Sequence, residues 1–240
     1  MGAMAFLRRT GLVTLALLGA CAPSKVEEPP PARQADAQQQ TLALQVMALQ
    51  DATVTLYPGH CAGVIVADGH HALTAAHCID GDIGEPQPVV LRSGKLLEGA
   101  VKVVDRMRDL AVIRLDERAP VHPLELTTTV PVPGQALLFA GRNDRPGDPQ
   151  EMTLERLGRC PSLPGVPQAL FTSMHGAKGD SGAPLVDEQL HVVGLVHGGA
   201  VCNIAAPTAA FVPVLDVLVA EVARTGAEPL GVGGSGGAGQ

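Results

Sequence analysis

Aromatic side chains are nearly absent from this sequence of 240 residues, which has no Trp, a single Tyr and four Phe. A core built from this chain must therefore be mainly aliphatic. Binding of single-stranded nucleic acid by stacking needs a platform of aromatic side chains, and this composition does not supply one. The sequence also lacks a block of Lys and Arg, and its formal net charge is −7. Both features argue against a nucleic-acid partner, and the acidic balance argues equally against electrostatic adhesion to anionic lipid.

Cysteine is sparse, and no C-x-x-C spacing occurs, so a structural zinc site is not indicated. The five cysteines are Cys21, Cys61, Cys78, Cys160 and Cys202. If Cys21 is set apart for the reason given below, the other four allow three disulfide pairings. His71 and His77 are six residues apart, a spacing that suits neither face of a metal-binding helix. We predict no metal and no cofactor.

The first twenty residues have the layout of a secretory signal. Arg8 and Arg9 precede an apolar run over residues 11–18, which is too short to remain as a membrane span, and small residues follow it. Removal of residues 1–20 gives the exported form a net charge of −9, because the two arginines are their only charged residues.

The end of this signal, Leu-Gly-Ala-Cys at residues 18–21, resembles the lipobox of bacterial lipoproteins. The resemblance implies that Cys21 receives diacylglycerol and becomes the mature N-terminus in the bacterial cell envelope. Ala22 follows in place of the aspartate that retains many lipoproteins at the inner membrane, which favours the outer membrane, facing the periplasm or the surface. The alternative is ordinary signal cleavage with an incidental cysteine.

Composition divides the mature chain into three parts. Residues 21–45 are rich in Pro, Gln and Ala and predict a flexible tether, and the Gly-rich residues 226–240 predict a disordered tail. Between them, residues 46–225 contain many short segments rich in Val, Leu, Ile and Thr, separated by Gly, Pro, Asp and Asn, which is typical of an all-β sandwich or barrel. Helical periodicity occurs at residues 213–224, and residues 41–50 could form a short helix before the first strand.

Three short motifs carry the candidate chemistry. His77 lies in LTAAHC, Asp109 opens the apolar segment RDLAVIRL, and Ser181 lies in GDSGAP. Each has an ordinary interpretation: a partly buried histidine, an aspartate in a turn before a strand, and a serine in a glycine-rich turn. A serine nucleophile needs a base, and the base needs an orienting group, so the three motifs gain meaning only together.

In this order the motifs closely resemble the three active-site blocks of the chymotrypsin-like (trypsin-like) serine proteases, over roughly residues 53–218. The resemblance implies that Ser181 is the nucleophile, His77 the general base and Asp109 the acid that orients His77. It further implies an oxyanion hole formed by the N–H groups of Gly179 and Ser181. The spacings between the motifs are short, as in compact bacterial members of this family.

The same resemblance implies the fold and the disulfides. We expect two six-stranded antiparallel β-barrels, at roughly residues 46–125 and 126–225, with the active site in the cleft between them and a C-terminal helix packed outside. In this family a disulfide staples the loop beside the catalytic histidine. That pairing corresponds to Cys61–Cys78 and leaves Cys160–Cys202 as the second bridge.

By offset from Ser181, the substrate-binding residues would be His175, Val196, His197, Gly198 and Gly199. His175 stands where trypsins place the aspartate that selects Arg and Lys, so trypsin specificity is not supported. A small or apolar preference and an acidic preference, the latter through His175 or His197, both stay open. The sequence thus predicts an exported, lipid-anchored, monomeric serine endopeptidase that acts on proteins or peptides. The alternative is a catalytically inactive relative that binds peptides or proteins.

Overall fold

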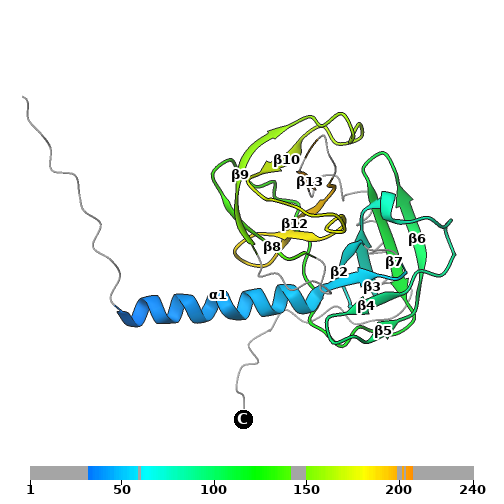
Figure 1. The fold of residues 1–240 in the computed structure, drawn as a ribbon, viewed down its shortest axis with the longest axis horizontal. Helices are drawn as coiled ribbons and strands as arrows, with labels where there is room; N and C mark the ends of the chain where they lie inside the picture. The colour runs from blue at the N-terminus through cyan, green and yellow to red at the C-terminus, as the bar shows by residue number, and fades with distance from the viewer. Residues whose placement is uncertain (1–31, 59–60, 142–149, 199–201, 203, 208–240) are drawn as a thin grey trace, which may run out of the picture.

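A computed structural model describes residues 32–58, 61–141, 150–198, 202 and 204–207 of the chain. The expected signal peptide, Cys21, Gly199, the helix expected at 213–224 and the Gly-rich tail lie outside these residues. The described part folds into two antiparallel β units with one long helix at the N-terminal side (Figure 1).

The first unit, which we call the N-terminal sheet, has seven strands in the order β5-β4-β1-β2-β3-β7-β6. Its strands are β1 (Thr53–Leu56), β2 (Ala62–Val66), β3 (His71–Thr74), β4 (Val89–Leu91), β5 (Leu96–Leu97), β6 (Gly99–Asp105) and β7 (Leu110–Leu115). Most strands pair with the strand that follows them in the chain, as in a meander. The exception is the pair β4 and β5, which lies on the other side of β1 from β2.

The N-terminal sheet has one strand more than the six expected from the sequence. The additional strand, β5, arises from a tight turn in which Gly94 has a φ of 83° and donates its N–H to the Leu91 carbonyl at 2.8 Å. The chain entering β4 also bonds to the opposite edge strand, since the Val101 N–H donates to the Glu85 carbonyl at 2.9 Å. The sheet therefore curls far enough for the segment before β4 to bond to the edge strand β6, but in the described residues it forms a sheet and not the closed barrel that was expected.

The second unit, the C-terminal barrel, is closed and has the six strands that the sequence analysis expected, in the order β10-β13-β12-β11-β8-β9. Its strands are β8 (Ala136–Phe139), β9 (Gln150–Gly158), β10 (Ala169–Thr172), β11 (Pro184–Val186), β12 (Val192–Val196) and β13 (Ile204–Pro207). Closure gives every strand a neighbour on both sides. An exposed edge strand would leave backbone N–H and C=O groups unpaired.

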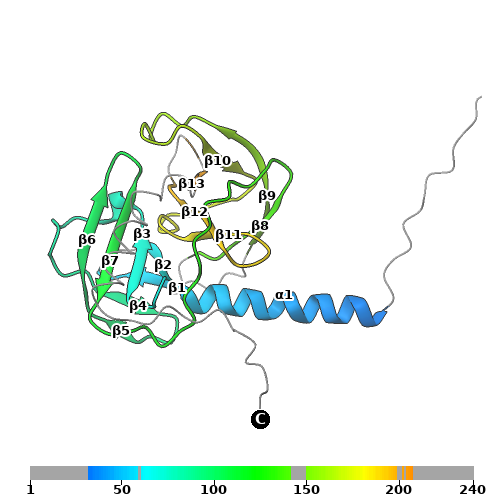
Figure 2. The same ribbon diagram turned by 180° about the vertical axis from the view of Figure 1, so that it is seen from behind.

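The segment of residues 116–135 leads from β7 to β8 and bonds to both units (Figure 2). The Leu124 N–H donates to the Ile65 carbonyl at 2.9 Å, and the Val192 N–H donates to the Glu125 carbonyl at 2.8 Å. These bonds fix the sheet and the barrel relative to each other, which a cleft built from both units requires.

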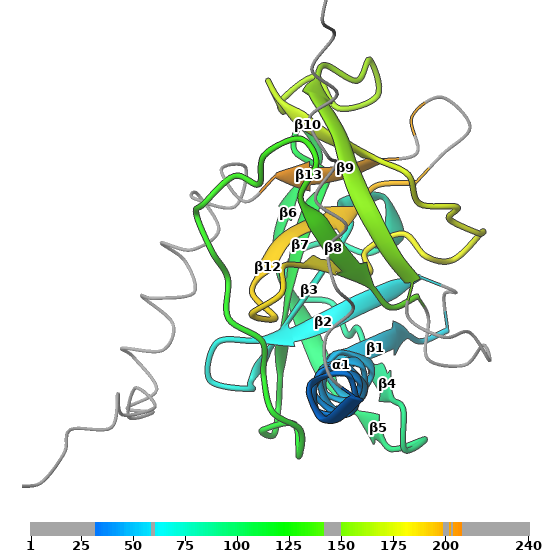
Figure 3. The ribbon, with the colours of Figure 1, turned by 90° about the vertical axis from the view of Figure 1, so that its left-hand side faces the viewer.

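Helix α1 (Ala32–Ala52) is longer than the helix suggested at residues 41–50, and its residues 32–45 were expected to belong to the tether. This segment has little to bury, but Ala and Gln have high intrinsic helix propensity and favour a helix without such burial. Burial begins near Leu49 and Ala52, where the helix enters β1, and the side chains of residues 36–44 are exposed. Figure 3, which looks along the helix, shows α1 beside β1. In the described part of the chain no helix is both long and apolar enough to cross a membrane.

The core is aliphatic, as the composition predicted: Phe139 is the one aromatic residue among the buried hydrophobic side chains of the described residues. One cluster fills the N-terminal sheet and another fills the barrel. A third cluster contains Leu73 and Val112 of the sheet together with Val186 and Leu195 of the barrel. The two units thus share one apolar interface, and the candidate site lies at its edge.

Candidate active site

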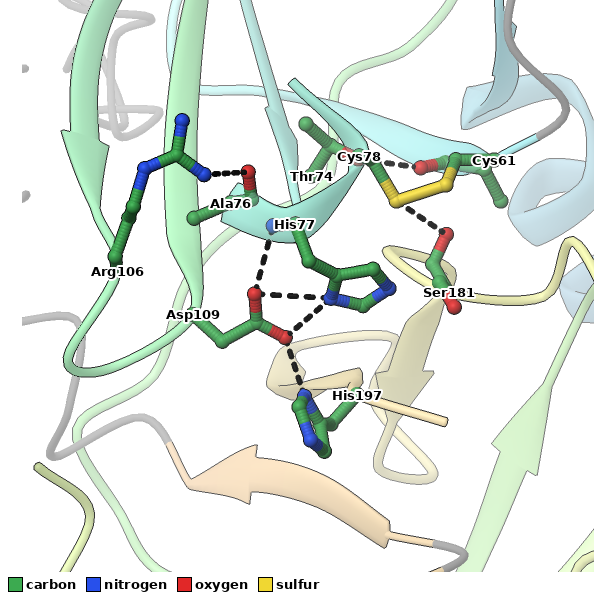
Figure 4. The surroundings of a disulfide bond; sticks show 10 residues. Cys61, Thr74, Ala76, His77, Cys78, Arg106, Asp109, Ser181 and His197 are labelled. Carbon is green, nitrogen blue, oxygen red and sulfur yellow. Dashed lines mark hydrogen bonds and ion pairs between the residues drawn. A yellow bond between two sulfur atoms is a disulfide. The ribbon is translucent and has the colours of Figure 1, made fainter. Parts of the chain in front are cut away.

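His77 lies in a single 3₁₀ turn, Ala76–Cys78, directly after β3. Two interactions hold this turn. The Arg106 guanidinium donates to the Ala76 carbonyl at 3.3 Å and to the Ile79 carbonyl at 3.4 Å, and the Cys61–Cys78 disulfide ties its end to the start of β2 (Figure 4). The backbone of His77 is therefore anchored while its side chain stays 44 % exposed.

Asp109 immediately precedes β7 and is only 7 % exposed. Its φ of 57° is a left-handed conformation that aspartate tolerates better than most residues. The carboxylate accepts the His77 backbone N–H at 2.9 Å, and the His77 Nδ1 lies 3.0 Å from Oδ1 and 2.8 Å from Oδ2. Because an ionised carboxylate can only accept, Nδ1 of His77 carries the hydrogen and Nε2 is left as the basic nitrogen.

The environment of Asp109 favours its ionised form. Burial acts to raise the pKa of this carboxyl, but hydrogen bonds from His197 and His77 and the charge of His77 outweigh burial and lower the pKa to about 2. Asp109 is therefore an anion at any pH at which His77 could act as a base.

Ser181 lies in the turn before β11, and its carbonyl accepts the Ala62 N–H of β2 at 2.8 Å. Gly182 has a φ of 83°, and a Cβ there would lie 2.2 Å from the Ala62 carbonyl oxygen and 2.3 Å from Thr74 Oγ1. Only glycine allows this close passage of the barrel against the sheet. Figure 4 shows His77 with Asp109 on one side and Ser181 on the other. Among the hydrogen bonds between described residues, none joins Ser181 Oγ to His77 Nε2.

The residues before Ser181 form a tight turn. The Asp180 N–H donates to the Ala177 carbonyl at 3.0 Å, and the buried Asp180 carboxylate accepts the Ala177 N–H at 2.6 Å. Gly179, within this turn, has a φ of 98°. Gly179 and Ser181, whose N–H groups are the expected oxyanion hole, thus flank the buried Asp180 in this turn.

The candidate residues meet in a cavity of about 530 Å³ at the junction of the sheet and the barrel. The described residues that line it are His77, Gly176, Ala177, Lys178, Gly179, Asp180, Ser181, Val196, His197 and Gly198. Three of the expected substrate-binding residues, Val196, His197 and Gly198, are thus present. His175 is exposed and is not among the described lining residues, and Gly199 lies outside the described part of the chain.

Gly198 keeps the space in front of the candidate nucleophile open. Its φ is 70°, and a Cβ at this position would lie 3.0 Å from Ser181 Oγ. A side chain here would therefore crowd the hydroxyl.

His197 makes a contact that the sequence did not indicate. Its Nδ1 is hydrogen-bonded to Asp109 Oδ2, and its Nε2 lies 2.9 Å from Ser162 Oγ. Both ring nitrogens are therefore engaged within the protein, which removes the support that this histidine lent to an acidic substrate preference. Spacing could not reveal the contact, because Asp109 and Ser162 are 88 and 35 residues away. The contribution of Arg106 also escaped the sequence analysis.

The structure contains both disulfides that the resemblance implied. Cys61–Cys78 has a Cα–Cα distance of 6.0 Å and Cys160–Cys202 one of 6.3 Å, both ordinary for a disulfide. The first bridge supports the turn of His77. The second joins the segment that contains Ser162 to the strand that follows His197.

Two groups of described side chains bring three potential metal ligands within 4.8 Å of one another. The first, Cys61, His77 and Cys78, contains the disulfide, so its sulfurs are not thiolates. The second, His77, Asp109 and His197, is already joined by hydrogen bonds that a metal would have to displace.

Comparison with solved structures finds the same fold. An inactive form of the Rv3671c protease of M. tuberculosis H37Rv superposes with a TM-score of 0.57 at 19 % identity, covering 78 % of this chain and 95 % of that one. Deg5 superposes with a TM-score of 0.56 at 22 % identity, covering 76 % and 92 %. At these identities the likeness concerns the fold alone.

Comparison with curated sequences finds two cyanobacterial proteins of Synechocystis sp. (strain ATCC 27184 / PCC 6803 / Kazusa). The putative serine protease HhoA is 27 % identical over 144 residues, which is 57 % of this chain and 36 % of HhoA. The putative serine protease HhoB is 30 % identical over 145 residues, which is 57 % of this chain and 34 % of HhoB. The chain therefore matches about a third of the length of each of these relatives.

The trypsin-like peptidase domain family matches residues 61–195, which is more than half of the chain. The match contains His77, Asp109 and Ser181 and ends before His197. With the fold and the arrangement of these three side chains, this match establishes that the chain belongs to the trypsin-like peptidase family.

Proposed function

We propose that the protein is a serine endopeptidase that cleaves peptide bonds through Ser181, His77 and Asp109. The observation that carries the proposal is the contact of His77 Nδ1 with both oxygens of the buried Asp109, together with the cavity that His77 and Ser181 both line. Family membership supports a protease, and the geometry supplies a base with its orienting acid beside a candidate nucleophile.

In the first half of the reaction, Ser181 Oγ attacks the carbonyl carbon of the scissile bond while its proton passes to Nε2 of His77. The N–H groups of Gly179 and Ser181 stabilise the oxyanion, where one such donor contributes about 3 kcal/mol to lowering the barrier. His77 then gives its proton to the departing amine, and the acyl group stays on Ser181. The hydrogen bond between nucleophile and base is often long in a free enzyme and shortens when substrate binds.

In the second half, His77 removes a proton from water, which attacks the acyl carbonyl and releases the acid product while Ser181 regains its proton. In both halves His77 is transiently an imidazolium beside Asp109. Because the pKa of Asp109 is lowered to about 2, this side chain is already ionised and does not take the proton itself.

The substrate class follows from the lining of the cavity. Val196 and Gly198 line the cavity beside Ser181, and both nitrogens of His197 are engaged with protein groups. Of the preferences that the sequence left open, these features favour small or apolar side chains over acidic ones bound by His197, although the cation Lys178 also lines the cavity.

The sequence and the disulfides suggest where the enzyme acts. Two disulfides in a domain of this size are typical of an oxidising, extracytoplasmic compartment, which agrees with the secretory signal at residues 1–20. We propose that the mature protein is a monomer in the bacterial envelope, anchored by lipid on Cys21, with the outer membrane favoured by Ala22.

The experiment that tests the proposed function is labelling with a fluorophosphonate, which reacts with activated serines, together with hydrolysis of casein. The wild type should be labelled, heating should abolish the labelling, and Ser181→Ala should lose both labelling and hydrolysis, the latter by about 10⁴ to 10⁶. Ser93→Ala, in the exposed β4–β5 turn, is the matched control and should behave as the wild type. A wild type that is not labelled, or a Ser181→Ala variant that still hydrolyses casein, would contradict the proposal.

A further inference from the structure

Asp109 is shared by two histidines. His77 comes from the N-terminal sheet and His197 from the end of β12 in the C-terminal barrel, and both rings bond the same carboxylate oxygen through Nδ1. The two rings are perpendicular, with centroids 5.5 Å apart (Figure 4). The ring of His197 is mostly buried, with 14 % of its side chain exposed.

The far side of His197 is also held. Its Nε2 lies 2.9 Å from Ser162 Oγ, and Ser162 Oγ lies 3.0 Å from Cys160 Sγ. The sulfur belongs to the Cys160–Cys202 disulfide and has no hydrogen, so it can only accept. In a neutral ring whose Nδ1 donates to Asp109, Nε2 can also only accept. The imidazole nitrogen is the stronger acceptor of the two, so Ser162 donates to Nε2.

The segment that presents Ser162 reaches across the cleft to the turn of Asp109. The Gly165 N–H donates to the Met107 carbonyl at 2.9 Å, and a Cβ on Gly165 would lie only 2.5 Å from that oxygen. The barrel therefore contacts the Asp109 turn at two points, once through backbone and once through the His197 side chain.

We propose that His197 is a positioning residue that holds Asp109 toward His77, and that Ser162 selects the tautomer in which His197 donates from Nδ1. The proposal rests on the proposed function of Ser181, His77 and Asp109. Neither histidine position alone would suggest it, because the contact depends on the way the barrel packs on the sheet.

The assignment of hydrogens follows from the three partners. Asp109 is ionised and accepts, so Nδ1 of His197 donates. With Ser162 donating to Nε2, His197 is neutral and both of its nitrogens are satisfied. An uncharged N–H donor fixes the position of the carboxylate without neutralising it. The negative charge of Asp109 can then stabilise the His77 imidazolium that forms during catalysis.

Three variants test the proposal in the full-length, disulfide-bonded protein. His197→Ala removes the donor. Loss of a hydrogen bond to a charged group, if it is felt fully in the transition state, slows the reaction about ten- to hundredfold. Its kcat should fall by this factor while KM changes little. His197→Asn keeps a neutral N–H donor near the place of Nδ1 and should retain kcat within about threefold at pH 8. His191→Asn is the matched control, because His191 Nδ1 lies 3.2 Å from Asp187 Oδ2 in the β11–β12 turn, away from the cavity, and its kcat should equal that of the wild type.

A His197→Ala variant with wild-type kcat, or a His197→Asn variant whose kcat falls as far as that of His197→Ala, would overturn the proposal.

A spectroscopic readout makes failure of this proposal distinguishable from failure of the proposed function. Imidazole N–H protons that donate to a carboxylate resonate at low field, so the wild type should show two such signals and His197→Asn one, with or without Ser181→Ala. Absence of fluorophosphonate labelling in the wild type would refute the proposed function. A single low-field signal in the wild type would refute the role of His197 even if Ser181 is labelled.

Discussion

Replacement of Asp109 by Asn should make the stability of the protein less dependent on pH at the acid end. The side chain is buried, and its carboxylate accepts hydrogen bonds from the His77 backbone, the His77 ring and the His197 ring. Asn has almost the same volume, so the substitution removes the charge and leaves the packing nearly unchanged. It also exchanges one acceptor oxygen for a donor group that faces these donors.

The magnitude follows from the lowered pKa of Asp109, which is about 2 in the folded protein against 3.8 for an unperturbed aspartate. A lowered folded-state pKa means that the carboxylate stabilises the fold above pH 4, where both states are ionised, and that this contribution is lost as the pH falls toward 2. At 1.36 kcal/mol per pKa unit, the contribution is about 2 kcal/mol. The wild type should therefore lose about 2 kcal/mol more of unfolding free energy between pH 4 and pH 2 than Asp109→Asn does.

The assay is denaturant unfolding of the oxidised protein from pH 2 to pH 7, with wild type and variant measured in parallel so that all other carboxyl groups cancel in the difference. Asp116→Asn, at an exposed carboxylate, controls for the change in net charge. At pH 7 the same Asp109→Asn protein should also hydrolyse casein about 10⁴-fold more slowly than the wild type, because the orientation of His77 is lost. A stability difference between wild type and Asp109→Asn that stays constant from pH 2 to pH 7 would show that Asp109 is not held as an anion by its two histidines.

Two further predictions concern the junction of the two units and the membrane anchor. Gly182→Ala should destabilise the protein by at least about 2 kcal/mol more than Gly134→Ala, because both glycines have positive φ but only a Cβ at 182 would overlap neighbouring atoms. Thermal unfolding measures both, and equal losses would show that the close passage beneath Ser181 is not what requires glycine. For the anchor, wild-type protein should partition into detergent and carry fatty acid, and Cys21→Ser should remain in the aqueous phase. Recovery of wild-type protein as a soluble species without fatty acid would contradict a lipid on Cys21.

The parts of the candidate site that the sequence predicted are those in which neighbouring residues constrain one another. LTAAHC and GDSGAP each place their functional residue at a strand end or in a turn, next to the small residues that the backbone there requires. Gly182 illustrates this, because its φ of 83° and its contact with β2 are consequences of the motif itself. The aliphatic core followed in the same way from composition, and the two disulfides followed from the family resemblance of the motifs.

The length of helix α1 and the number of strands in the N-terminal sheet could not be predicted from hydrophobic periodicity. Helix α1 extends over residues with little to bury, because Ala and Gln favour helix without tertiary contacts. The seventh strand of the N-terminal sheet comes from a turn at Gly94 that adds a strand of only two residues. Both departures are differences in element length and number, and they leave the relation between the sheet and the barrel unchanged.

The contact of a second histidine with Asp109 was decided by tertiary structure alone. From its sequence, His197 was a residue of the substrate pocket, and Ser162 had no assigned part. The ring of His197 bonds Asp109 because β12 ends at the face where the barrel meets the sheet, and Ser162 reaches the ring because a disulfide and a backbone hydrogen bond hold its segment across the cleft. The sequence determined which side chains could carry the chemistry. Which of them share a carboxylate was determined only by the packing of two units whose contacting residues lie far apart in the chain.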